Sequence, residues 1–280
     1  MREITVIEPP SVADLRPLQA MRRLPQFGDL LRTLTAHRLK VRYKQSHLGV
    51  AWAMIQPLSM MLVFTLMFTV LGRSPGGELP YALFAYSALV PWTAFAGGLS
   101  NSATSLTGHA SLITKVYFPR EILPFTYVLA ALVDFGLAAV ALFGLMLWFG
   151  VSLSLSALWA IPAILLLTLF LTGGSLLLAA LQVHHRDVGI AMPVLLQVWM
   201  FATPVIYPLD AVKSALPRPL YYLYILNPMA GVVDTFRRAM VLHQGPMLEA
   251  LLTGLLVSTL LLAGAFLYFK SHERTMADSV

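Results

Sequence analysis

The residues with the clearest chemical potential are cations and one phenol gathered in a short stretch. In HRLKVRYKQSHLG, which begins at His37, a lysine or arginine stands at every second position from 38 to 44. The candidate binding residues are Arg38, Lys40, Arg42, Tyr43 and Lys44. Guanidinium and ammonium groups bind phosphate through charge-assisted hydrogen bonds, so this cluster could hold an anionic ligand or an anionic protein surface. The alternative is an orientation signal that is attracted to anionic lipid.

The other reactive residue types form no recognisable catalytic set. The sequence has no cysteine and no G-x-x-x-x-G-K-[ST] phosphate loop, which excludes thiol chemistry and nucleotide binding of that kind. His184, His185 and Asp187 resemble metal ligands, but neighbouring residues on a helix point about 100° apart and would not converge. Ser100 lacks a histidine base in another apolar segment. The sequence therefore disfavours an enzyme.

Asp134 is the one ionisable residue well inside a predicted membrane span. Such residues usually face a protein interior or a wet cavity, so Asp134 either serves function or makes a structural hydrogen bond. Trp92, Phe95 and Trp199 also lie inside predicted spans, and aromatic faces can stack on sugar rings. We predict that these four residues line a substrate path, although an aromatic belt at the membrane surface explains many of the other aromatic residues.

Composition places these residues in a helical membrane protein. The chain of 280 residues is 58% hydrophobic and 11% charged, whereas about 25% of residues are charged in soluble domains. A spanning helix needs about 20 mainly apolar residues. Apolar runs predict six spans, near 51–72, 80–100, 122–149, 156–183, 189–208 and 248–269. We therefore expect an all-α polytopic membrane protein with six transmembrane helices.

The distribution of charge predicts the orientation of these spans. Most of the 19 lysines and arginines lie on the side that six spans assign to both termini, so both termini are expected in the cytoplasm. The predicted organisation is a tail over 1–26, an amphipathic interface helix over 27–50, a membrane domain over 51–270 and a tail over 271–280.

Two segments outside the spans also carry helical patterns. The apolar stripe before the first span consists of Phe27, Leu30, Leu31, Leu34, Val41 and Leu48. The external segment 209–247 is too apolar for a simple linker, and Asn227 and Pro228 have the residue types of a helix cap and a first helical position. We predict two short re-entrant or interfacial helices there.

Four sequence blocks resemble one transporter family. HRLKVRYKQSHLGVAWAMIQPL resembles the segment leading into the first span of the membrane subunits of polysaccharide-exporting ATP-binding cassette (ABC) transporters, the permeases for O-antigen, capsule and teichoic acid. VYFPREILPF (116–125), HRDVGIAMPVLLQVWMFATPVIYP (185–208) and LNPMAGVVDTFRRAMV (226–241) are similar to later family segments in the same order. Arg38 and Leu39 depart from the pattern, because the family frequently has an acidic residue there.

The resemblance implies a permease that does not itself hydrolyse ATP. Two copies would form a channel in the bacterial cytoplasmic (inner) membrane. Two separate ATPase subunits would bind ATP and magnesium and drive export of a lipid-linked polysaccharide, so no cofactor is expected in this chain. A small lipophilic cargo is the alternative substrate, and a membrane enzyme is the remaining alternative.

The resemblance also implies roles for individual segments. The helix over 27–47 would be the interface helix, whose basic cluster meets the ATPase or the lipid pyrophosphate. The loop 101–121 would contain a coupling helix, with Arg120 and Glu121 either at that interface or paired with each other. The segment 209–247 would form an external gate. The candidate gate residues are Tyr221, Tyr222, Tyr224 and Phe236.

Overall fold

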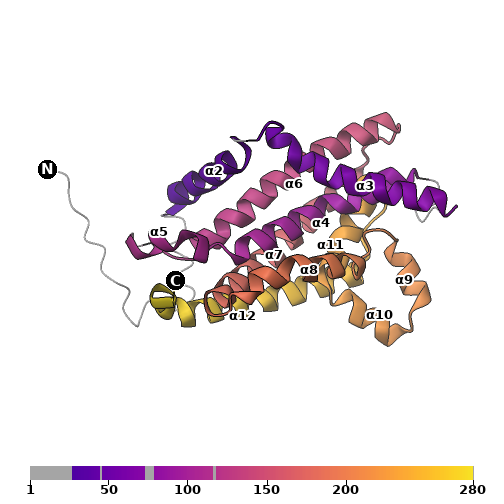
Figure 1. Cartoon of the computed structure of the whole chain (residues 1–280). Coiled ribbons are helices and arrows are strands. Elements are labelled where there is room, and N and C mark those ends of the chain that lie inside the picture. The colour runs from indigo at the N-terminus through magenta and orange to yellow at the C-terminus, as the bar shows by residue number, and fades with distance from the viewer. Residues whose placement is uncertain (1–26, 45, 73–78, 116–117, 280) are drawn as a thin grey trace.

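The protein is a bundle of long helices that run side by side (Figure 1). The computed structural model describes residues 27–44, 46–72, 79–115 and 118–279, with side chains described as far as Glu273. Within these ranges every regular element is a helix, which confirms the predicted all-α class. The predicted tail over 1–26 lies outside the described residues.

Within the described ranges, five helices are long and apolar enough to cross a membrane. They are α3 (Trp52–Val70), α4 (Tyr81–Ala103), α6 (Ile122–Trp148), α7 (Ala160–His184) and α12 (Leu248–Ser279). Each coincides with one predicted span, which supports the reading of the apolar runs. The last helix continues to Ser279, through most of the stretch that we predicted as a tail.

The remaining predicted span, 189–208, is only partly helical. Its helix, α8 (Asp187–Phe201), has 15 residues. At 1.5 Å per residue this gives about 22 Å, which is short of the ~30 Å hydrocarbon layer. The chain leaves helical geometry after Phe201 although the following residues, ATPVIYP, are still largely apolar. The membrane domain is thus polytopic, with five full-length candidate spans and one short apolar helix among the described residues.

Three of the long helices, α3, α6 and α7, pack against α4, the most deeply buried of the five, and α12 packs against α7. Small residues permit this approach, as is common between membrane helices. A Cβ atom on Gly98 of α4 would lie 2.8 Å from the Cβ of Ala131 on α6. On α7, a Cβ on Gly173 would lie 3.0 Å from the backbone nitrogen of Leu262 on α12. Glycine at these positions therefore brings neighbouring backbones together.

An amphipathic helix, α2 (Gly28–Lys44), lies beside the first half of α6 at one end of the bundle (Figure 1). The first part of its predicted apolar stripe, residues 27 to 34, packs on a core that includes Ile113 of the short helix α5 (Ala110–Lys115). The second part of the predicted stripe is not buried, because Val41 and Leu48 are 57% and 51% exposed. A turn then enters α3, and Gly49 adopts φ +49° there, a conformation that favours glycine.

Three short helices lie at the end of the bundle opposite α2, in the segment where we predicted two (Figure 1). They are α9 (Leu209–Ala215), α10 (Arg218–Ile225) and α11 (Pro228–Arg237), and a π-helical turn (Arg238–Leu242) follows. The predicted cap is confirmed, since the side chain of Asn227 accepts a hydrogen bond from the Met229 amide at 3.1 Å. Every residue of α11 is buried, and the helix packs against α4, α7 and α12.

The contact between α11 and α12 yields a stability prediction. A Cβ on Gly231 would lie 2.5 Å from the carbonyl oxygen of Ala250 and 3.0 Å from its carbonyl carbon, so backbone would have to move. We expect Gly231→Ala to destabilise the protein by about 1–3 kcal/mol, despite the better helix propensity of alanine. Thermal unfolding in detergent measures this change. The matched control is Gly264→Ala on α12, where a Cβ meets nothing within 4 Å. Equal melting temperatures for the two variants would contradict the prediction.

Candidate functional site

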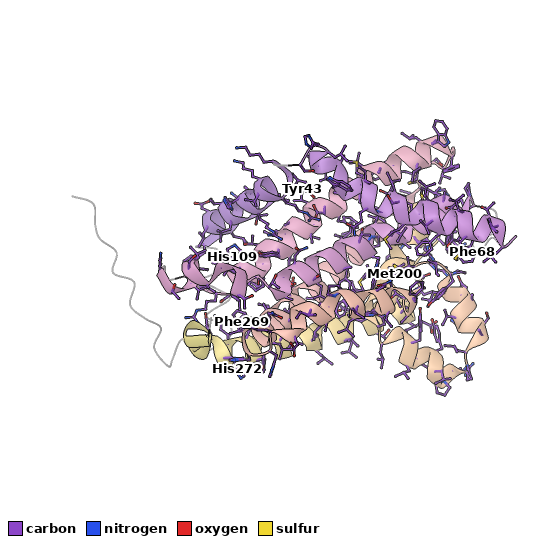
Figure 2. All side chains as sticks on the ribbon, viewed as in Figure 1. Tyr43, Phe68, His109, Met200, Phe269 and His272 are labelled. Carbon is purple, nitrogen blue, oxygen red and sulfur yellow. The ribbon has the colours of Figure 1, made fainter. Side chains whose placement is uncertain are left out.

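The basic cluster of α2 is divided between two faces of the helix. Lys40 and Lys44 are exposed on one face. Arg38 and Arg42, which are also four residues apart, reach the membrane helices from another face. Tyr43 joins this inner group at the C-terminal end of α2 (Figure 2). The sequence predicted one cluster of five residues for the ATPase or the lipid pyrophosphate. In the structure the two lysines are exposed, while Arg38, Arg42 and Tyr43 contact the membrane helices.

Asp134 is the residue on which the end of α2 docks. Its two carboxylate oxygens accept hydrogen bonds from the Arg42 guanidinium at 2.5 Å and from the Tyr43 hydroxyl at 2.5 Å. Burial, reinforced by the hydrogen bond to this carboxylate, raises the pKa of Tyr43 to about 12, so the phenol remains a donor at neutral pH. Of the two roles considered for Asp134, the structure contains the hydrogen-bonded one, and its partner is α2 rather than a neighbouring span.

Arg38 makes a second contact one turn earlier on α2. Its guanidinium donates to the side-chain oxygen of Asn101 on α4 at 2.9 Å, and it lies 4.4 Å from the ring centroid of Tyr127 on α6. That distance is within the range of a cation–π interaction. The Asn101 amide in turn donates to the carbonyl of Gly97 at 2.6 Å. Arg38 therefore joins α2 to two long helices at once.

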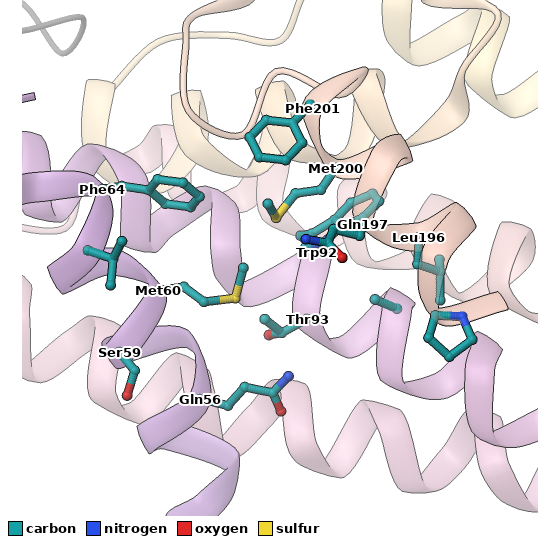
Figure 3. Close-up of a pocket in the computed structure, with 13 residues that line it drawn as sticks. Gln56, Ser59, Met60, Phe64, Trp92, Thr93, Leu196, Gln197, Met200 and Phe201 are labelled. Atoms are coloured by element: carbon teal, nitrogen blue, oxygen red, sulfur yellow. The ribbon is translucent and has the colours of Figure 1, made fainter. Parts of the chain in front are cut away.

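A second feature is a pocket of about 500 Å³ between α3, α4 and α8 (Figure 3). Most of its lining is apolar, but four residues with polar side chains are part of the lining. They are Gln56 and Ser59 of α3, Thr93 of α4 and Gln197 of α8. Trp92 also lines the pocket. We did not single out the glutamines from the sequence, although an amide inside an apolar run is itself a signal of a polar cavity.

The other predicted path residues lie elsewhere. Phe95 is fully buried and stacks on Phe170 with ring centroids 5.2 Å apart. Trp199 meets Phe95 edge-on at 5.3 Å. These rings form an aromatic core next to the pocket. Of the four predicted path residues, only Trp92 is among the described residues that line the pocket. A part in transport for Phe95, Trp199 or Asp134 stays a prediction.

Arg120 and Glu121 bind to α12 and not to each other. The buried Glu121 carboxylate lies 2.9 Å from the ammonium group of Lys270, which also lies 2.9 Å from Glu273. The Arg120 guanidinium donates to the backbone carbonyl of Glu273. Burial raises the pKa of Glu121, although the charge of Lys270 opposes the shift. These contacts join the start of α6 to the end of α12.

Lys270 should be essential for stability because it neutralises a buried carboxylate. We expect Lys270→Met to destabilise the protein by about 3–5 kcal/mol, since it leaves Glu121 buried without its cation. The double variant Glu121→Gln/Lys270→Met should recover most of this loss. Thermal unfolding in detergent provides the measurement, and Lys115→Met, at an exposed lysine, provides the control. A double variant no more stable than Lys270→Met alone would refute the proposed coupling.

Arg237 is a buried residue that the sequence did not single out. Its guanidinium donates to the backbone carbonyls of Pro204, Val205 and Tyr207 at 2.7, 2.6 and 3.1 Å. It also lies 3.8 Å from the ring centroid of Phe84. Burial lowers the pKa of Arg237 to about 10, which still leaves it charged at neutral pH. This one side chain thus donates hydrogen bonds to three carbonyl groups of the irregular backbone that follows α8.

The predicted gate residues are distributed around the same end. Tyr221 donates to Glu249 at 2.9 Å, Tyr224 lies 3.2 Å from the Tyr207 hydroxyl oxygen, and Tyr222 is exposed. Phe236 is buried and meets the ring of Phe135 edge-on at 5.4 Å. A role in an external gate stays a prediction for these four residues.

Comparisons with known proteins agree with this architecture. The family described as "ABC-2 type transporter" matches residues 29–241. An O-antigen export system permease protein RfbA from Myxococcus xanthus is 33% identical over 267 residues, which cover 94% of this chain and 100% of that protein. A protein of the same name from Klebsiella pneumoniae is 29% identical over 211 residues, covering 75% of this chain and 79% of that protein. These matches confirm the resemblance seen in the four sequence blocks, and the chain belongs to the ABC-2 type transporter family.

Proposed function

We propose that this protein is the permease subunit of an ATP-driven exporter that moves a lipid-linked polysaccharide of the O-antigen kind across the bacterial cytoplasmic membrane. The observation that carries the proposal is the similarity along the full length of the Myxococcus xanthus export permease. Two copies of the chain form the channel, and two ATPase subunits bind ATP and magnesium. The permease contributes the path, and its partner contributes the chemistry.

The pocket between α3, α4 and α8 gives physical support for a polar path. Gln56 and Gln197 are exposed although they lie on otherwise apolar helices. Amides facing lipid would lose hydrogen bonds, so such groups face a protein interior or water. A second copy placed against α3 and α8 would cover them and enclose a polar channel. Amide groups bind sugar hydroxyls, and the indole of Trp92 offers an apolar face for a sugar ring.

If α8 and the segment after it together cross the membrane once, the chain crosses it six times. Both termini then lie in the cytoplasm. Irregular backbone is tolerated at membrane depth where protein groups satisfy its carbonyls. Arg237 does so for Pro204, Val205 and Tyr207. The excess of lysine and arginine on the side of the N-terminus then faces the cytoplasm, in agreement with the positive-inside rule.

The division of labour can be tested by purification. If the proposal is right, the permease retains an ATPase subunit through affinity purification, and lipid-linked polysaccharide stimulates ATP hydrolysis by the complex. Lipid carrier without the glycan serves as the control substrate. Stimulation by small lipophilic compounds but not by the glycan would favour the alternative cargo, and the lack of any ATPase partner would contradict the proposal.

A further inference from the structure

The two halves of α2 are held by different kinds of contact. Phe27, Leu30 and Leu34 pack the first half on an apolar core. In the second half, Val41 is mostly exposed, so apolar burial contributes little there. What attaches the second half is a set of polar contacts made by Arg38, Arg42 and Tyr43.

Asp134 has the geometry of an anchor for these contacts. Each of its oxygens is engaged by a different α2 residue at 2.5 Å, and only 16% of its side chain is exposed. A carboxylate in an apolar span is unfavourable unless it is paired, so the pairing benefits Asp134 as well as α2. The contact joins residues 92 positions apart in the sequence, across two different helices.

The contact at Asp134 positions residues on both sides of the turn that joins α2 to α3. On α2 it orients the helix so that Lys40 and Lys44 face outward. Beyond the turn, Trp52 at the start of α3 donates to Ser46 at 3.0 Å, and α3 carries Gln56 into the pocket. Asp134 thus fixes the point from which both the outward lysines and the first pocket helix are positioned.

We propose that Asp134 is a positioning residue that, through Arg42 and Tyr43, docks the second half of the interface helix on the membrane domain. Its role in export, which rests on the function proposed above, is to hold α2 and the start of α3 in a fixed place while the ATPase acts on α2.

Distance measurements on the permease alone test the docking directly. The chain contains no cysteine, so nitroxide labels on Lys40→Cys and His185→Cys report only on these two exposed sites. In lipid nanodiscs, with labelled copies diluted in an excess of the cysteine-free permease, the parent should give one narrow distance distribution and Asp134→Ala a broad one. The reversed pair Arg42→Asp/Asp134→Arg should narrow the distribution again. Val133→Ala, on the adjacent exposed residue of α6, should leave it unchanged.

Transport by the complete complex provides the second readout. We expect Asp134→Ala to lower export about tenfold, equivalent to about 1.4 kcal/mol, and the reversed pair to restore it. A distribution as narrow in Asp134→Ala as in the parent would overturn the proposal, as would a reversed pair that remains as broad as the single variant. Because the label distance requires neither ATPase nor substrate, a failure of the docking is distinguishable from a failure of the proposed export function.

Discussion

Neutralising Arg38, Lys40, Arg42 and Lys44 together to glutamine is expected to abolish export while the transmembrane helices remain inserted. The inner arginines would lose Asn101, Tyr127 and Asp134 as partners, and the outward lysines would lose their charge. Arg22, Arg23 and Arg32 remain to orient the first span. The measurements are ATP-dependent export and a topology assay on the same membranes. Export at the parental rate would contradict any functional role for the cluster.

The structure allows this result to be divided between the two faces of α2. Lys40→Gln/Lys44→Gln should weaken association with the ATPase about tenfold, which is a loss of about 1.4 kcal/mol of binding free energy. The helix α2 should remain docked in this variant. Arg38→Gln/Arg42→Gln should instead release α2 and retain the outward lysines. The conservative control Lys40→Arg/Lys44→Arg should export normally. If the lysine pair retains the ATPase but no longer responds to the glycan, the lysines bind the lipid pyrophosphate.

Replacing Arg237 by methionine is expected to destabilise the fold strongly. The variant would leave the buried carbonyls of Pro204 and Val205 and the partly buried carbonyl of Tyr207 without their donor. Hydrogen bonds from charged groups contribute about 1.5–3 kcal/mol each, so we expect a total loss of at least about 3 kcal/mol. Arg237→Lys should be intermediate, because one ammonium group cannot reproduce the planar guanidinium fork.

Thermal unfolding of purified protein in detergent measures the Arg237 effect. The matched control is Arg218→Met, an exposed arginine at the same end of the molecule. We expect the control to unfold at the parental temperature and Arg237→Met to unfold well below it or to fail to accumulate. A parental melting temperature for Arg237→Met would show that these carbonyls have other partners.

The fold was predictable where one physical effect dominates. Long apolar runs give the five full-length helices, and the Asn227-Pro228 pair gives the start of α11, because these signals are local in sequence. The end of α8 was not predictable in the same way. The residues after Phe201 are as apolar as a helix requires, and what holds them in another conformation is an arginine about thirty positions away.

The candidate site was only partly predictable for a similar reason. Residue type identified the cations of α2 and the carboxylate of Asp134, but their pairing joins positions 92 apart, and no local pattern encodes it. Aromatic residues were ambiguous because core packing and cavity lining select the same side chains, and Phe95 proved to be core. Gln56 and Gln197, in contrast, could have been found, since each interrupts an apolar run.

Transport in purified vesicles tests the central claim most directly. The permease and its ATPase would be reconstituted together, with a fluorescent lipid-linked polysaccharide in the outer leaflet and on the same side as the ATPase. We predict that ATP moves the glycan into the lumen, where added glycosidase cannot reach it, and that vesicles lacking either protein give no protection. Glycan that stays fully accessible in the complete system, with ATP being hydrolysed, would contradict the assignment of this protein as a polysaccharide export permease.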